Sequence, residues 1–222
     1  MTRRAALPVA LALAAAVLAA PWSLAAARAQ RPARPSPPPA GSPTLVIDGV
    51  NGAVALRLGL SFYPLSRPGG DLAPIRAPIV FVGYGVSAPE WDYDDYAGVD
   101  VGGAAVIVLT HEPQEEEPGP RFDGAELTAH AGLGRKARVA RDRGARLVLL
   151  VEDPSHATDR ARTPAWTDDP QIDTYAVPML RVDRLRLEHA TGLDIERLAR
   201  EIDRTFTPRS RPVPGAQVTY LD

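Results

Sequence analysis

Histidine and carboxylate side chains are the groups in this sequence that could bind a metal ion. The densest carboxylate run, Glu115-Glu116-Glu117, lies in a proline-rich segment with no histidine helix facing it. Because a catalytic zinc site needs several histidine and carboxylate ligands, this run is predicted to be a solvated loop. None of the chain's histidines is followed two residues later by aspartate: His111, His130, His156 and His189.

The segment Gly83-Tyr84-Gly85-Val86-Ser87-Ala88 fits the GxGxxA pattern of dinucleotide-binding loops. That pattern works because a helix begins at the glycines and directs its N-terminus at the pyrophosphate. Pro89 and the acidic residues after it oppose such a helix, and their negative charge would disfavour a phosphate. A nucleotide site is therefore not expected here.

Asp92, Asp94 and Tyr96 occupy the first, third and fifth places of a calcium-loop pattern. The sixth place holds Ala97 where glycine is needed, and the twelfth holds Gly103 where a bidentate glutamate belongs. An EF-hand is excluded, whereas an irregular calcium contact stays open.

The sequence offers no clear nucleophile. It contains no cysteine and no serine in a GxSxG setting, so thiol chemistry, disulfides and a nucleophile elbow are all excluded. His130 directly precedes a predicted helix, where a hydrogen-bonded structural histidine and a functional one are both conceivable. Lys136, the single lysine, is interpreted as a solvated charge.

The most distinctive stretch runs from Ile79 to Asp100. Residues 79–82 are four consecutive apolar residues, which predicts a strand buried on both faces. Gly83 and Gly85 indicate a close approach or positive φ, and residues 91–96 interleave three aromatic rings with three aspartates. We expect an anchored loop with its rings packed inward and its carboxylates in water or capping backbone N–H groups.

Apolar periodicity then predicts a crossover unit. Residues 104–109 and 147–151 read as buried strands, and 131–143 as a helix that Gly144 ends, so the unit should be parallel and right-handed. Residues 112–126 are acidic and proline-broken, which indicates an exposed loop. Further elements are a hairpin from 45–47 and 54–58, a loop at 67–71, a strand at 177–182, helices capped by Asp183 and Asp194, and a strand at 217–221. The fold class predicted is a β-rich α+β domain.

Several segments, in family order, resemble the protease-associated (PA) domain inserted in secreted zinc aminopeptidases of metallopeptidase family 28. They cover about residues 72–222 and read PIVFVGYGVSAPEWDYDDYAGVDVGG, VIVLTHEPQEEE, FDGAELTAHAGLGRKARVARDRGARLVLLVEDP, YAVPMLRVD and TGLDIERLAREIDRTFTPRSRPVPGAQVTYLD. His130 lies in the family's Thr-x-His-Ala pattern.

The resemblance implies a domain that carries no zinc itself. The family's two-zinc ligands are a His-x-Asp pair, a Glu-Glu pair, a lone acid and a distal histidine, all in the catalytic domain, which is absent from this chain. PA domains of this family cover or flank the protease active site and help to select peptide substrates or partner proteins. We therefore expect no cofactor in this chain, with zinc only in that absent catalytic domain.

The N-terminus predicts export. Arg3 and Arg4, an apolar run and a small-x-small site at Ala27-Arg28-Ala29 indicate a signal peptide over 1–29, cleaved between Ala29 and Gln30. The two arginines leave twin-arginine export open beside the general secretory route, and the destination is secreted or periplasmic. Residues 30–43 read as a proline-rich linker before a domain at 44–222 with its core at about 72–210. The net charge of −2 falls to about −5 after cleavage, which disfavours a nucleic-acid partner, and no membrane association is expected once the signal is removed.

The function expected is that of an exported, non-catalytic PA-type domain that binds a peptide substrate or a peptidase catalytic domain. One alternative is a truncated or split zinc aminopeptidase that needs a separate catalytic part. Another is a stand-alone exported module that binds peptides or cell-wall material. The ligand, the oligomeric state and whether the chain acts alone are not determined by the sequence. Candidate contact residues are Tyr84, Trp91, Tyr96, Glu115, Glu116, Glu117 and His130.

Overall fold

Eight strands form one mixed sheet that curls around two helices. In this computed structural model, the described residues are 42–66, 73–115, 121–122, 124, 126–156 and 177–222. The sheet has the order β2-β1-β10-β4-β7-β8-β9-β3. Its strands are β1 (Thr44–Gly49), β2 (Gly52–Leu56), β3 (Phe62–Ser66), β4 (Ile75–Phe81), β7 (Ala105–Leu109), β8 (Leu147–Val151), β9 (Met179–Val182) and β10 (Arg211–Leu221).

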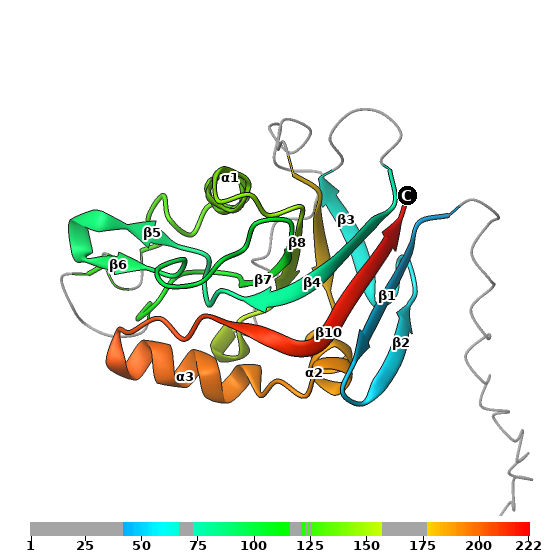
Figure 1. The fold of residues 1–222 in the computed structure, drawn as a ribbon. Coiled ribbons are helices and arrows are strands. Elements are labelled where there is room, and N and C mark those ends of the chain that lie inside the picture. The colour runs from blue at the N-terminus through cyan, green and yellow to red at the C-terminus, as the bar shows by residue number, and fades with distance from the viewer. Residues whose placement is uncertain (1–41, 67–72, 116–120, 123, 125, 157–176) are drawn as a thin grey trace, which may run out of the picture. The chain divides into compact units, whose positions relative to one another are not determined.

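Three α-helices cover the two faces of this sheet in the described part of the chain (Figure 1). They are α1 (Leu133–Asp142), α2 (Arg184–Thr191) and α3 (Ile195–Thr205). A small sheet of β5 (Ser87–Ala88) and β6 (Tyr93–Asp94) stands apart, with the 3₁₀ turn η1 (Pro89–Trp91) between its strands; a second 3₁₀ turn is η2 (Pro154–His156). The β-rich α+β class predicted from the sequence is confirmed.

The central strands β4, β7 and β8 are parallel, and their side chains alternate between two cores. Ile107 and Leu149 face the core that α2 and α3 close with residues such as Leu198. Val108 and Leu150 face a second core, which α1 closes with Ala137 and Ala140. Because both faces are covered, β7, β8 and the end of β4 from Ile79 onward read as unbroken apolar runs, which confirms these strands and the parallel crossover expected from the sequence.

The helix ends follow their local sequence. Asp183 and Asp194 accept hydrogen bonds from the amides of Arg186 and Arg197, as N-cap residues do. Gly192 ends α2 at φ 71°. The two aspartate N-caps were predicted from the sequence.

The outer strands complete the sheet in antiparallel fashion. β1 and β2 form the expected hairpin, and β10 pairs with both β1 and β4. β10 is longer than the predicted strand at 217–221, because a register irregularity between Pro212 and Gln217 lets it continue along β4. The loop expected at 67–71, the expected signal peptide and most of the expected linker lie outside the described residues. No helix among the described residues is long and apolar enough to cross a membrane.

Candidate functional site

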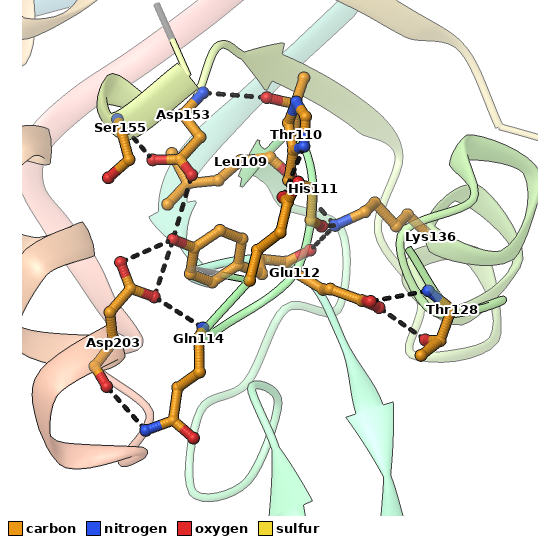
Figure 2. A network of polar contacts seen from close by, with 12 residues as sticks. Leu109, Thr110, His111, Glu112, Gln114, Thr128, Lys136, Asp153, Ser155 and Asp203 are labelled. Atoms are coloured by element: carbon orange, nitrogen blue, oxygen red, sulfur yellow. Dashed lines mark hydrogen bonds and ion pairs between the residues drawn. The ribbon is translucent and has the colours of Figure 1, made fainter. Parts of the chain in front are cut away.

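Buried and partly buried polar side chains gather where the parallel strands β4, β7 and β8 end. The carboxyl ends of parallel strands are where ligands bind in open α/β sheets, which makes this position the candidate site. Figure 2 shows Lys136 from α1 reaching backbone carbonyls after the strand ends, and Asp203 from α3 meeting side chains there. We call this set the carboxyl-end network; its members are Tyr84, Thr110, Glu112, Gln114, Thr128, Lys136, Asp153 and Asp203.

Lys136 is at the centre of the network, and its prediction as a solvated charge is wrong. Its side chain is fully buried on α1. The ammonium donates hydrogen bonds to the backbone carbonyls of Tyr84, Leu109 and His111, the Leu109 bond measuring 3.1 Å. Since an ammonium has three N–H groups, all of its donors are used, and they join the loops after β4 and β7 to the helix.

Burial lowers the pKa of Lys136 to about 8, while Asp95, Glu112 and Asp153 act to raise it. The side chain is therefore charged at neutral pH. An ammonium that is charged and fully hydrogen-bonded is a poor nucleophile, and its role here is to neutralise carboxylates and hold carbonyls.

Asp95 follows the second of the two arrangements expected for the aspartates of this loop, since it binds a backbone N–H instead of lying in water. It is completely buried and accepts hydrogen bonds from the Val86 amide at 3.0 Å and the Tyr93 hydroxyl at 2.7 Å. Burial raises the pKa of Asp95 to about 7, against the opposing effect of these two donors and of Lys136. The rings of Tyr93 and Tyr96 are buried as predicted, and Gly83 and Gly85 have positive φ as expected.

Glu112 holds the segment before α1. It is buried, so the prediction of an exposed loop over 112–126 is wrong at this residue and at Phe122. Its two carboxylate oxygens accept from the amide of Thr128 at 2.7 Å and from its hydroxyl at 2.6 Å. The sequence misled because a glutamate that is buried by its contacts with Thr128, 16 residues away, looks the same in the sequence as a solvated one.

Tyr84 connects β4 to α3. Its hydroxyl donates to a carboxylate pair, lying 3.0 and 3.1 Å from the two oxygens of Asp203 and 3.3 Å from Asp153. Burial, followed by the charges of Asp153 and Asp203, raises the pKa of Tyr84 well above its usual value. The phenol therefore stays protonated and serves as a donor.

The loop after β7 is held in a tight conformation. His111 and Gln114 both have φ of 63°, a left-handed conformation that is unfavourable for residues other than glycine. Gln114 contacts α3 twice, through its amide to Asp203 Oδ1 at 3.1 Å and through its side chain to the Asp203 carbonyl at 2.8 Å. His111 Nδ1 lies 2.7 Å from Glu115. The contacts from α1 and α3 supply the stabilisation that this backbone requires.

His130 lies beside the network in an aromatic cluster. Its ring packs near Trp91 and Phe122, with centroids 5.4 and 5.7 Å away. Nε2 contacts Glu90 Oε1 at 2.7 Å, whereas Nδ1 is buried without a hydrogen-bond partner. Glu90 is half exposed, so this corner reaches the surface.

The structure separates the predicted contact residues into buried and accessible ones. Tyr84 and Tyr96 are 1% and 2% exposed, so neither lies on the surface, whereas Trp91 and Glu115 are partly exposed. Whether any of them contacts a peptide or partner stays a prediction. Glu116 and Glu117 lie outside the described residues, as do Ala29 and Gln30 at the predicted cleavage site.

Sequence reasoning missed the residues that build the network. A signal for Lys136 was present: Leu133, Lys136, Ala137 and Ala140 fall at i, i+3, i+4 and i+7, which places the lysine on the apolar face of α1. No comparable signal marks Asp95, Glu112 or Asp203, because their hydrogen bonds depend on how the folded chain arranges its loops and not on the periodicity of one helix or strand.

No group of three or more histidine, aspartate or glutamate side chains suited to a metal ion occurs among the described residues. In the loop considered for calcium, Asp94 instead accepts the Tyr96 amide at 3.0 Å and an Arg143 guanidinium N–H at 2.8 Å. What the network does chemically, on these contacts, is to neutralise buried charge and fix loops.

Comparisons with known proteins give the following result. No protein-family model matches the sequence, and no curated protein matches it. Among solved structures, the aminopeptidase from Aneurinibacillus sp. strain AM-1 has a TM-score of 0.38 and 15% identity, over 84% of this chain and 31% of that one. BSAP, a zinc aminopeptidase from Bacillus subtilis, has a TM-score of 0.39 and 10% identity, over 81% of this chain and 30% of that one. The chain thus spans less than a third of the length of these enzymes.

Proposed function

We propose that this chain is an exported, non-catalytic recognition domain that presents fixed loops to a peptide substrate or to a peptidase catalytic domain. The observation that carries this proposal is the set of hydrogen bonds made by Lys136. Its three N–H groups all bind backbone carbonyls at the ends of β4 and β7. An ammonium in an enzyme site would keep a donor for substrate. Here the charge instead stabilises the backbone, as expected of a scaffold that holds a binding surface rigid.

The accessible residues beside the scaffold suit a peptide. Trp91 is partly exposed, Glu90 is half exposed and Leu127 is 52% exposed. Glu90 and Trp91 contact the buried ring of His130, and Leu127 lies three residues before it in the chain. Accessible aromatic and apolar side chains together with a carboxylate are typical of protein-recognition surfaces.

The resemblance of residues 72–222 to PA domains supports a partner of the peptidase type. A PA-type domain acts by steric contact, so no turnover is required of this chain. Its substrate would be selected by the loops and cleaved by a catalytic part that carries the zinc ligands.

An activity assay and a binding assay test this function together. We expect the purified chain to release no p-nitroaniline from aminoacyl-p-nitroanilides, with or without added zinc. Zinc-dependent turnover with stoichiometric bound metal would overturn the proposal in favour of an autonomous peptidase.

For binding, hydrogen exchange is measured with casein peptides and, separately, with soluble peptidoglycan fragments. Protection of residues 89–96 and 126–130 by the peptides, lost in Trp91→Ala and kept in the control Tyr63→Ala, supports the proposal. Tyr63 is a suitable control because it is an exposed aromatic residue on the distant strand β3. Protection only by the peptidoglycan fragments would indicate a cell-wall-binding module instead, and protection by neither probe would reject the peptide-binding part.

A further inference from the structure

The strand β2 forms one edge of the eight-stranded sheet, and no strand lies beyond it in the part of the chain that the structure describes (Figure 1). Its residues, Gly52–Leu56, read GAVAL and carry no charge. Ala53 and Ala55 are exposed, whereas Val54 is partly buried against the core beneath α2. The strand is therefore a neutral edge with a small apolar surface.

The register shows which backbone groups of β2 point outward. Gly49 pairs with Gly52 across the two-residue turn Val50–Asn51, and this closing pair exchanges both hydrogen bonds. Bonded and non-bonded pairs alternate along an antiparallel ladder, so Val54 and Leu56 also bond to β1. The N–H and C=O groups of Ala53 and Ala55 must then face away from β1. These are four outward groups in a row.

The opposite edge of the sheet is protected in a way that β2 is not. There, β3 contains Pro64, and its pairing with β9 is irregular between Pro64 and Ser66. Proline, bulges and charges are the usual means by which sheet edges avoid pairing with another strand. Their absence from β2 is what distinguishes it as an interaction surface.

We propose that the β2 edge pairs with β2 of a second copy of this chain, antiparallel about a two-fold axis through Val54. Ala53 then lies opposite Ala55 of the second copy, and Ala55 opposite its Ala53. The four outward groups of each chain find partners in four hydrogen bonds across the axis. The two sheets continue into one another.

The flanking residues favour the second copy over an unrelated strand. Val54 meets its own copy in a non-hydrogen-bonded pair, where side chains approach closely and β-branched residues pack well. Gly52 leaves room opposite the Leu56 side chain. Asn51 lies opposite Arg57, so no like charges face each other. The edge ends there, because the Arg57 amide and carbonyl bond within their own turn to Ser61.

The interface is small, so the dimer is expected to be weak and dependent on concentration. Sedimentation equilibrium on the purified chain should give a mean mass that rises with concentration toward twice the monomer value. A mass that stays at the monomer value up to several hundred micromolar would overturn the proposal.

A charge exchange tests the register. Ala53→Lys/Ala55→Lys places like charges opposite one another in both bonded pairs, as does Ala53→Glu/Ala55→Glu. Each double variant should be monomeric, whereas an equal mixture of the two should dimerise at least as well as the unchanged chain. A folding defect cannot be rescued by mixing, so the mixture separates misfolding from loss of the interface. Dimers of either variant alone would place the contact elsewhere and overturn the proposal, as would a mixture that stays monomeric.

A single cysteine gives an independent readout, because the chain has none of its own. In the proposed register, Val54→Cys brings two thiols together in a non-hydrogen-bonded pair whose Cα separation of about 4.5 Å suits a disulfide. Mild oxidation should cross-link this variant rapidly. Tyr63→Cys, on the opposite edge, is the matched control and should cross-link at least tenfold more slowly. Equal rates for the two variants would contradict pairing through β2.

Discussion

The Lys136 ammonium lies 3.1 Å from the backbone carbonyl of Leu109, the last residue of β7. The same ammonium also binds the carbonyls of Tyr84 and His111. A helix on one face of the sheet is thereby joined to two loops at the carboxyl ends of its parallel strands. The only lysine of the chain is thus a structural cation, and its removal should show how much the loops depend on it.

Lys136→Met should destabilise the protein by about 3–5 kcal/mol, because it leaves the backbone carbonyls of Tyr84, Leu109 and His111 without their donor. Urea unfolding monitored by circular dichroism gives the free energy of unfolding. Arg135→Met, at the exposed neighbouring position of α1, is the control and should change it by less than about 0.5 kcal/mol. Similar losses in the two variants would show that the ammonium bonds contribute little.

Tyr84→Phe should cost about 1–3 kcal/mol, since it removes the hydroxyl that donates to the carboxylates of Asp203 and Asp153. Tyr63→Phe is the matched change on the surface, where the lost bond to the Gly59 carbonyl is exposed. That variant should be close to neutral in the same urea experiment. If Tyr63→Phe lost as much stability as Tyr84→Phe, burial of the Tyr84 hydroxyl would not explain the loss in Tyr84→Phe.

Asp95 should give the stability a characteristic dependence on pH. Its pKa rises from 3.8 to about 7 on folding, so the folded state binds more protons than the unfolded chain between these values. The contribution of Asp95 is therefore most favourable at low pH and is lost as the pH rises through this window, by up to about 4 kcal/mol.

The variant Asp95→Asn cannot titrate at this position. Its free energy of unfolding minus that of the unchanged chain should increase from about pH 4 to about pH 7 and then level off. Subtraction removes the contributions of other carboxyl groups. Parallel stability curves for the two proteins would show that Asp95 keeps an ordinary pKa.

Gly85→Ala should be more costly than Gly103→Ala, although both glycines have positive φ, 66° and 74°. A Cβ at Gly85 would lie 2.8 Å from the buried Val108 side chain, whereas one at Gly103 would meet no atom within 4 Å. Gly103→Ala should thus lose about 1–2 kcal/mol from backbone strain, and Gly85→Ala a further 1–3 or so from overpacking. Equal losses in thermal or urea unfolding would mean that the turn moves to admit the methyl group.

Much of the fold could be predicted because its signals are local. The unbroken apolar run of 79–82, the helix ended by Gly144 and the caps Asp183 and Asp194 each depend on residues a few positions apart. Covering both faces of β4, β7 and β8 leaves a signature in composition alone. The segment from 112 to 126 was less tractable, because the sequence does not tell a buried carboxylate from an exposed one.

The amino-acid sequence by itself determined the central strands, the three helices, the α+β class and the absence of any cysteine chemistry, but it did not mark β3, β5 or β6. Only the tertiary structure decided that Lys136 is buried, that Asp95 carries a raised pKa, and that Tyr84 reaches Asp203 from a position 119 residues away. The physical reason is that hydrophobic periodicity and capping act along one element. The protonation and bonding of a charged side chain depend instead on which distant atoms the folded chain brings within hydrogen-bond distance.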